Sequence, residues 1–123
     1  MPKLPTVPVR HPRDTTPLTF EWGSINWLCN QELDPEALQT LGLVFIQPGQ
    51  RNPVHRHPNC EELLVVLSGE CDHSLEGEWH HLEPGSMIRI PAGVKHNAIN
   101  RGWEPVRMLI CYSSADRQTE FFE

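Results

Sequence analysis

The stretch from Gly49 to Gly69 reads GQRNPVHRHPNCEELLVVLSG and carries two histidines, His55 and His57, two positions apart. Alternate side chains of a β-strand share a face, so both imidazoles are expected to point the same way. Glu62 opens the apolar run that follows and reaches the same point if residues 58–60 turn the chain back. The stretch therefore predicts two strands that bring two imidazoles and a carboxylate together.

A second stretch, from Gly85 to Asn100, reads GSMIRIPAGVKHNAIN and supplies a third imidazole. His96 is expected on a strand of its own, beyond the turn at residues 91–93. Three neutral imidazoles and one carboxylate are a strong donor set for first-row transition metals, with coordination positions left for water or substrate. The spacing of the two stretches therefore favours one metal site.

The rest of the chain indicates an all-β sandwich or barrel, because short apolar runs alternate with Gly and Pro turns. We expect strands at 18–28 (one or two, around Gly23), 41–47, 62–67, 71–75, 79–82, 87–90, 96–99 and 106–112. A short helix is expected from Asp34 to Thr40, because Asp34 is a favourable N-cap and Pro35 suits the first helical position.

The chain of 123 residues is expected to form one domain, residues 18–123, preceded by an extended Pro-rich arm. Residues 1–17 contain five prolines, which exclude a helix or a central strand there. The sequence does not show the role of this arm.

The formal net charge of −6 disfavours nucleic acid or an acidic membrane as a partner, since both need a basic surface. No apolar run is long enough for a transmembrane span or a secretory leader. The four cysteines are scattered without a C-x-x-C pair. We therefore expect a cytoplasmic protein with reduced cysteines.

The two stretches resemble the motifs of the cupin superfamily, whose members are small double-stranded β-helix barrels of the jelly-roll type. The first motif, G-x5-H-x-H-x3,4-E-x6-G, fits Gly49, His55, His57, Glu62 and Gly69. The second, G-x5-P-x-G-x2-H-x3-N, fits Gly85, Pro91, Gly93, His96 and Asn100. One copy of each motif indicates a single-domain monocupin.

The resemblance implies that His55, His57, Glu62 and His96 bind one divalent transition metal, with Mn, Fe, Ni, Cu and Zn all suited to these ligands. It also implies that Glu62 is the catalytic carboxylate, able to leave the metal and carry a proton. Glu61 is the weaker candidate, because only Glu62 keeps the six-residue spacing to Gly69.

The resemblance further implies a metal-dependent enzyme acting on a small oxygen-rich molecule. The reaction would be that of a dioxygenase, or of an isomerase or lyase on a sugar acid or keto acid. The alternative is a non-catalytic cupin module that binds a metal or a small ligand. Neither the substrate nor the metal follows from the sequence.

Several other side chains remain open candidates for the pocket. His73 is expected to be a structural or surface residue rather than a residue at the edge of the pocket. Cys60 lies in the turn between the ligands and is a weak candidate for an extra ligand. Three arginines are candidates for anchoring a carboxylate substrate: Arg51, Arg89 and Arg107. Each is expected to be a surface charge instead.

Both faces of the strand at residues 62–67 are apolar, since Leu63, Val65 and Leu67 lie opposite the face of Glu62. A single barrel buries only the inner face, so the outer face needs a cover. We therefore expect a homodimer packed sheet on sheet, as in many cupins.

Overall fold

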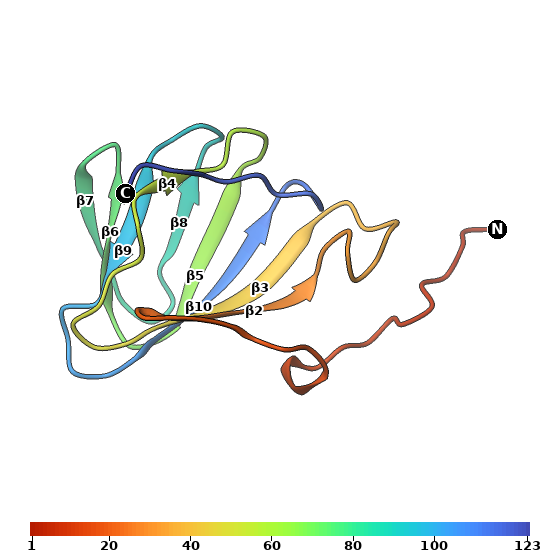
Figure 1. The fold of residues 1–123 in the computed structure, drawn as a ribbon, viewed down its shortest axis with the longest axis horizontal. Coiled ribbons are helices and arrows are strands. Elements are labelled where there is room, and N and C mark those ends of the chain that lie inside the picture. The colour runs from red at the N-terminus through yellow and green to blue at the C-terminus, as the bar shows by residue number, and fades with distance from the viewer.

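The computed structural model describes residues 1–123 and contains two antiparallel sheets that face each other (Figure 1). The six-stranded sheet has the order β1 (Leu18–Phe20), β2 (Gly23–Cys29), β3 (Thr40–Ile46), β10 (Val106–Tyr112), β5 (Glu62–Ser68), β8 (Met87–Ile90). The five-stranded sheet has the order β11 (Glu120–Phe121), β4 (His55–Arg56), β9 (His96–Ile99), β6 (Cys71–Leu75), β7 (Glu78–Leu82). The predicted all-β class is confirmed.

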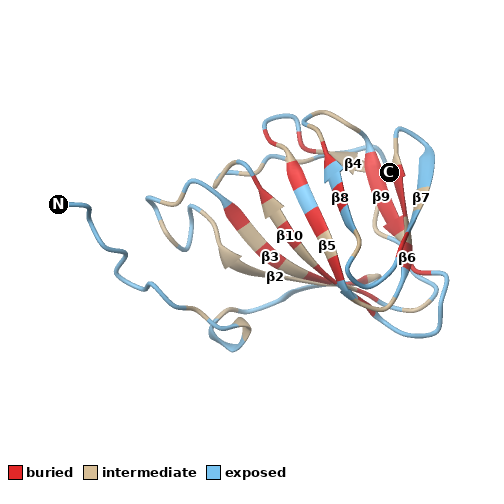
Figure 2. Cartoon of the chain, turned by 180° about the vertical axis from the view of Figure 1, so that it is seen from behind, coloured by how far each residue is buried: buried red, intermediate tan, exposed pale blue.

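The core lies between the sheets and follows from the period-two pattern of the strands. Along β3, β5 and β10 every second residue is buried, which gives β5 its alternating bands in Figure 2. The buried core side chains of these strands are Val44, Ile46, Leu64, Val66, Val106, Met108, Ile110 and Tyr112. Because the strands alternate strictly, Glu62 shares the inner face with Leu64 and Val66.

The outer face of the six-stranded sheet keeps apolar side chains exposed. Leu63 and Leu67 on β5 are 41% and 44% exposed, and Met87 on the neighbouring β8 is 56% exposed. Isolated exposed apolar residues are ordinary, whereas a contiguous group on one sheet face is typical of an interaction surface.

The prediction of a short helix from Asp34 to Thr40 is wrong, because residues 34–39 form a turn and a bend and Thr40 already opens β3. The Asp34 carboxylate does not cap a helix but accepts two hydrogen bonds from Arg10, at 2.8 and 3.3 Å. Arg10 also donates to the backbone oxygen of Leu28, at 2.7 Å. A segment this short cannot offset the cost of helix nucleation without help from packing.

The N-terminal residues extend away from the sheets (Figure 1). The single helical element is the 3-10 turn η1 (Pro12–Asp14), capped by the side chain of His11, which accepts from the backbone N–H of Arg13. No helix in the chain is long and apolar enough to cross a membrane.

After β10 the chain crosses the open end of the barrel, and residues 113–123 are called the C-terminal strap below (Figure 1). Its β11 pairs with β4 in the register Glu120 with Arg56 and Phe121 with His55. Arg56 and Glu120 also form an ion pair at 2.7 Å. The strap therefore lies against the strand that carries His55 and that leads directly into His57.

Two motif residues shape the corners of the barrel rather than its site. Gly69 has a φ of +75°, and a Cβ there would lie 2.4 Å from the backbone oxygen of Pro105, so only glycine fits. Asn100 is fully buried and its Nδ2 donates to the backbone oxygens of Ile46 and Glu104, at 3.0 and 2.7 Å. These contacts fix the loops around the site.

Candidate metal centre

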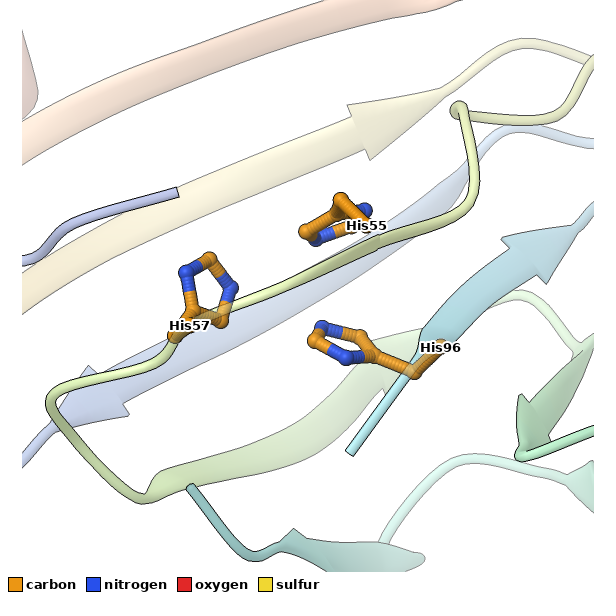
Figure 3. Close-up of side chains that lie close together, drawn as sticks. All are labelled: His55, His57 and His96. Atoms are coloured by element: carbon orange, nitrogen blue, oxygen red, sulfur yellow. The ribbon is translucent and has the colours of Figure 1, made fainter. Parts of the chain in front are cut away.

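Three imidazoles meet inside the barrel, and Figure 3 shows their rings turned toward a common space. His55 on β4 is the direct cross-strand partner of His96 on β9, and His57 follows β4. One ring nitrogen from each lies within 4.8 Å of the others. His57 and His96 are each only 2% exposed. The predicted convergence of these three side chains is thus present.

Each of the three imidazoles is oriented by a backbone carbonyl near its Nδ1. A carbonyl oxygen only accepts, so Nδ1 carries the proton and Nε2 keeps its lone pair for the centre. Such hydrogen bonds typically orient histidines that bind metals. The acceptors of His55, His57 and His96 are the backbone oxygens of Pro53, Gln118 and Val94, at 2.6, 3.0 and 2.9 Å.

The carboxylate of Glu62 joins the histidines from the first position of β5. Its Oε1 lies 3.3 Å from His57 Nε2 and 3.2 Å from His96 Nε2, yet these three buried atoms form no hydrogen bond. Buried polar atoms are nearly always satisfied. Donors held about 2.0–2.2 Å from one metal ion lie about 3.0–3.5 Å apart. The two separations from Glu62 Oε1 therefore fit a metal ion shared with His57 and His96.

The protonation states also suit a metal. Burial lowers the pKa of His55 to about 3, aided by the neighbouring His96. Burial alone would raise the pKa of Glu62, but the contacts with His57 and His96 outweigh it and hold that pKa below its usual range. At neutral pH His55 is therefore neutral and Glu62 ionised, the states in which they bind metal.

His55, Glu62 and His96 line a cavity of about 320 Å³ between the sheets, whereas His57 is not among its lining residues. Its walls come from three parts of the chain. The six-stranded sheet contributes Leu64, Met108 and Tyr112, the other sheet His73 and Ala98, and the strap Arg117, Thr119 and Phe121. A cavity of this size with mostly apolar walls and a few polar groups is typical of a small-molecule site.

The two weaker ligand candidates lie outside this group. Glu61 points outward and forms an ion pair with Arg89 on the surface. Cys60 is buried, at 3% exposed, and burial raises the pKa of its thiol. A neutral buried thiol behaves as a small apolar side chain rather than a ligand.

His73 is a buried residue of the cavity wall, so it is not on the surface and borders the pocket, the alternative that was expected less. It is 2% exposed, and its ring stacks on His96 with centroids 5.6 Å apart. Burial lowers its pKa to about 4. The signal was the inward parity that His73 shares with buried Cys71 on β6.

None of the three arginines singled out from the sequence reaches the cavity. Arg51 pairs with Glu123 on the surface, Arg89 with Glu61, and the guanidinium of Arg107 lies 5.3 Å from the ring centre of Phe45. The arginine that lines the cavity is instead Arg117 of the strap. No periodic pattern in the sequence marks that residue.

The cupin domain family model matches residues 42–112, more than half of the chain. The chain belongs to the cupin family. This cupin is 35% identical over 69 residues to the polyketide synthase CurC of Streptomyces cyaneus, covering 56% of this chain and 45% of that protein. It is 30% identical over 110 residues to protein MJ1618 of Methanocaldococcus jannaschii, covering 86% of each.

Solved structures share the cupin fold. The oxalate decarboxylase of Lactobacillus farciminis, in its formate complex, superposes with a TM-score of 0.84 at 24% identity, over 91% of this chain and 35% of that one. An oxalate oxidase complexed with glycolate superposes with a TM-score of 0.77 at 23% identity, over 85% of this chain and 57% of that one. The chain spans about half the length of two curated relatives, CurC and the rhicadhesin receptor of Pisum sativum. It spans most of the length of MJ1618.

Proposed function

We propose that this cupin binds one divalent transition metal through His55, His57, His96 and Glu62 and is an enzyme acting on a small oxygen-rich molecule. The observation that carries the proposal is the group of three buried donor atoms without partners, His57 Nε2, Glu62 Oε1 and His96 Nε2. An uncompensated buried carboxylate costs several kcal/mol. A divalent cation removes that cost and uses all three lone pairs.

The proposed role of Glu62 is that of a ligand and catalytic carboxylate. A bound metal would supply Lewis acidity, or an anchor for oxygen, next to the cavity. Glu62 lies at the cavity wall and pairs across the sheet with Tyr112. Burial raises the pKa of Tyr112 well above its usual value, so its hydroxyl stays protonated beside the carboxylate. Glu62 is then the group that accepts and returns a proton.

The substrate class follows from the size and walls of the cavity. About 320 Å³ is at the lower end of the range for ligand sites, which favours a small molecule over a drug-sized one. Two structural relatives, an oxalate decarboxylase with formate and an oxalate oxidase with glycolate, hold small oxygen-rich acids in this fold. We propose either oxygen-dependent cleavage or an isomerase or lyase reaction on a sugar acid or keto acid.

The test replaces His57 by Ala and compares it with His81→Ala, an exposed histidine outside the cavity. His57→Ala should lose metal binding by at least about 100-fold and lose all turnover, while His81→Ala should match the wild type. Circular dichroism would confirm that both variants fold. Full metal occupancy in His57→Ala would refute the proposed centre.

Turnover separates an enzyme from a binding module. Metal-loaded protein would be screened with diketones, catechols and keto acids, with and without oxygen. A tight ligand that is never converted under either condition would favour the non-catalytic module.

We also propose a homodimer formed through the outer face of the six-stranded sheet, supported by the exposed Leu63, Leu67 and Met87. Analytical ultracentrifugation at micromolar concentration should give the mass of two chains. Leu63→Arg should shift it to one chain, whereas Leu38→Arg, in a loop where Leu38 is 83% exposed, should not. A single-chain mass for the wild type would contradict the dimer.

A reducing, cytoplasmic location is proposed as well. All four cysteines are unpaired, as expected where thiols stay reduced.

A further inference from the structure

Arg117 differs from every other arginine of the chain in being half-buried without a carboxylate partner. Of the eight arginines, five form ion pairs with Asp or Glu. Arg13 and Arg107 lack such a partner but are exposed to water. Arg117 lines the cavity of the proposed metal centre. Removing a guanidinium from water without a counter-ion costs free energy, which a bound anion would offset.

The guanidinium of Arg117 is held in place by its surroundings. It lies 4.7 Å from the ring centre of Trp27 and 5.1 Å from that of Tyr112. One N–H donates to Thr119 Oγ1 at 2.6 Å. Stacking of this kind orients the plane of a guanidinium, which carries five N–H donors. Most of its donors are therefore left for a ligand.

Arg117 also lies next to the proposed metal ligands. Its Nη1 is 3.4 Å from His57 Nδ1, so one imidazole ring separates the guanidinium from the centre. His57 Nδ1 donates to Gln118 and does not serve Arg117 as an acceptor. No carboxylate, Glu62 included, is within ion-pair distance of Arg117.

The charges of the site leave room for an anionic ligand. Glu62 is the one carboxylate among the residues that line the cavity, and its single charge cannot balance both Arg117 and a divalent ion. A planar carboxylate matches the fork of a guanidinium, and a second oxygen on the same ligand can approach the centre. The mostly apolar walls suit the carbon part of such a ligand, and the volume is at the lower end of the range for ligand sites.

We propose that Arg117 anchors the carboxylate of the substrate and that the substrates are small 2-hydroxy or 2-oxo acids. This inference rests on the proposed function and narrows its substrate class. It assigns the selection of the ligand to the strap, which lies outside the matched family region of residues 42–112.

The test measures ligand binding by calorimetry on Zn²⁺-loaded and on metal-free protein, after metal content has been measured by plasma mass spectrometry. The probes are glycolate and glycolamide, its uncharged counterpart, with lactate and pyruvate as further acids. The variants are Arg117→Gln and the charge-retaining Arg117→Lys. Arg107→Gln is the matched control, since Arg107 also stacks on an aromatic ring and lacks a carboxylate partner.

Wild type and Arg107→Gln should bind glycolate more tightly than glycolamide. Arg117→Gln should weaken glycolate binding by about 10- to 100-fold while leaving glycolamide binding within about twofold. The affinity of Arg117→Lys for glycolate should lie between those of the wild type and Arg117→Gln. Metal content and melting temperature should stay unchanged in all variants. Equal weakening of both probes, unchanged glycolate binding in Arg117→Gln, or no binding of any of the three acids by wild type would overturn the proposal.

Failure of the metal centre gives a different result. A wild type that takes up no Zn²⁺ contradicts the proposed function. Selectivity of the metal-free protein for glycolate, lost in Arg117→Gln, would still support the anchor.

Discussion

The barrel strands and the C-terminal strap supply the same cavity in different ways. His55 and His96 face each other across β4 and β9, and Glu62 starts the inward row of β5. The strap pairs with β4 only through the short β11, and residues 113–119 before it are held by single polar contacts, such as that between Gln118 and His57. The pleat of a strand determines which side chains point inward, whereas a strap depends on where each contact holds it.

This difference separates two tasks within one site. The barrel brings together the donors proposed to hold the metal, while the strap adds Arg117, Thr119 and Phe121 to the cavity wall. We therefore expect changes in the barrel to affect metal binding most, and changes in the strap to affect which ligand is selected.

Glu62→Gln tests the barrel side of this contrast and should have the largest effect. The amide keeps the shape of Glu62 but loses the charge, so metal affinity should fall by at least about 100-fold with the fold retained. Competition with a chelator measures the affinity. Glu61→Gln is the matched control and should bind metal as the wild type does, because Glu61 pairs with Arg89 on the surface. Equal losses in both variants would remove Glu62 from the ligand set.

The pH dependence of stability tests whether the barrel imidazoles are as buried as the structure shows. In the folded metal-free protein the pKa values of His55 and His73 are about 3 and about 4, against 6.5 for an exposed histidine. The unfolded chain thus binds more protons between these values, so stability is complete above pH 6.5 and declines as the pH falls toward them.

For each of these two histidines, the free energy of unfolding should fall by about 1.4 kcal/mol per pH unit between pH 6.5 and the pKa of the folded state. Urea unfolding between pH 7.5 and 4.5 measures the slope, and His73→Gln should reduce it by about half. A free energy of unfolding that stays constant down to pH 4.5 would contradict the burial of both rings.

Asn59→Ala tests the strap side and should have the smallest effect on the metal. The Asn59 side chain donates to the backbone oxygen of Asp116 at 2.9 Å and accepts from the backbone N–H of Gln118 at 3.0 Å. Its loss should loosen the carbonyl that orients His57 and lower metal affinity by up to about tenfold. Asn30→Ala, which removes a loop hydrogen bond to Leu33 outside the cavity, is the control. A loss as large as that of Glu62→Gln would erase the proposed division between barrel and strap.

The same contrast explains what could be predicted from the sequence. The strand 87–90 was predicted with the bounds that the structure has, because Gly85 and Pro91 flank the apolar run. The convergence of His55, His57 and His96 followed from strand parity and motif spacing. The helix predicted at residues 34–40 was wrong because the segment is too short to nucleate one, and its expected N-cap, Asp34, binds the distant Arg10 instead. Arg117 was missed because long-range contacts place the strap, and no local pattern encodes them.

Metal content is the measurement that tests the central claim most directly. Untagged protein grown in a mixed-metal medium would be analysed by plasma mass spectrometry, before and after reloading with Mn²⁺, Fe²⁺, Ni²⁺, Cu²⁺ and Zn²⁺. The account predicts about one equivalent of a transition metal per chain, as expected for one site built from four donors. A protein that stays metal-free after reloading would contradict it and leave the three histidines and Glu62 as a polar pocket.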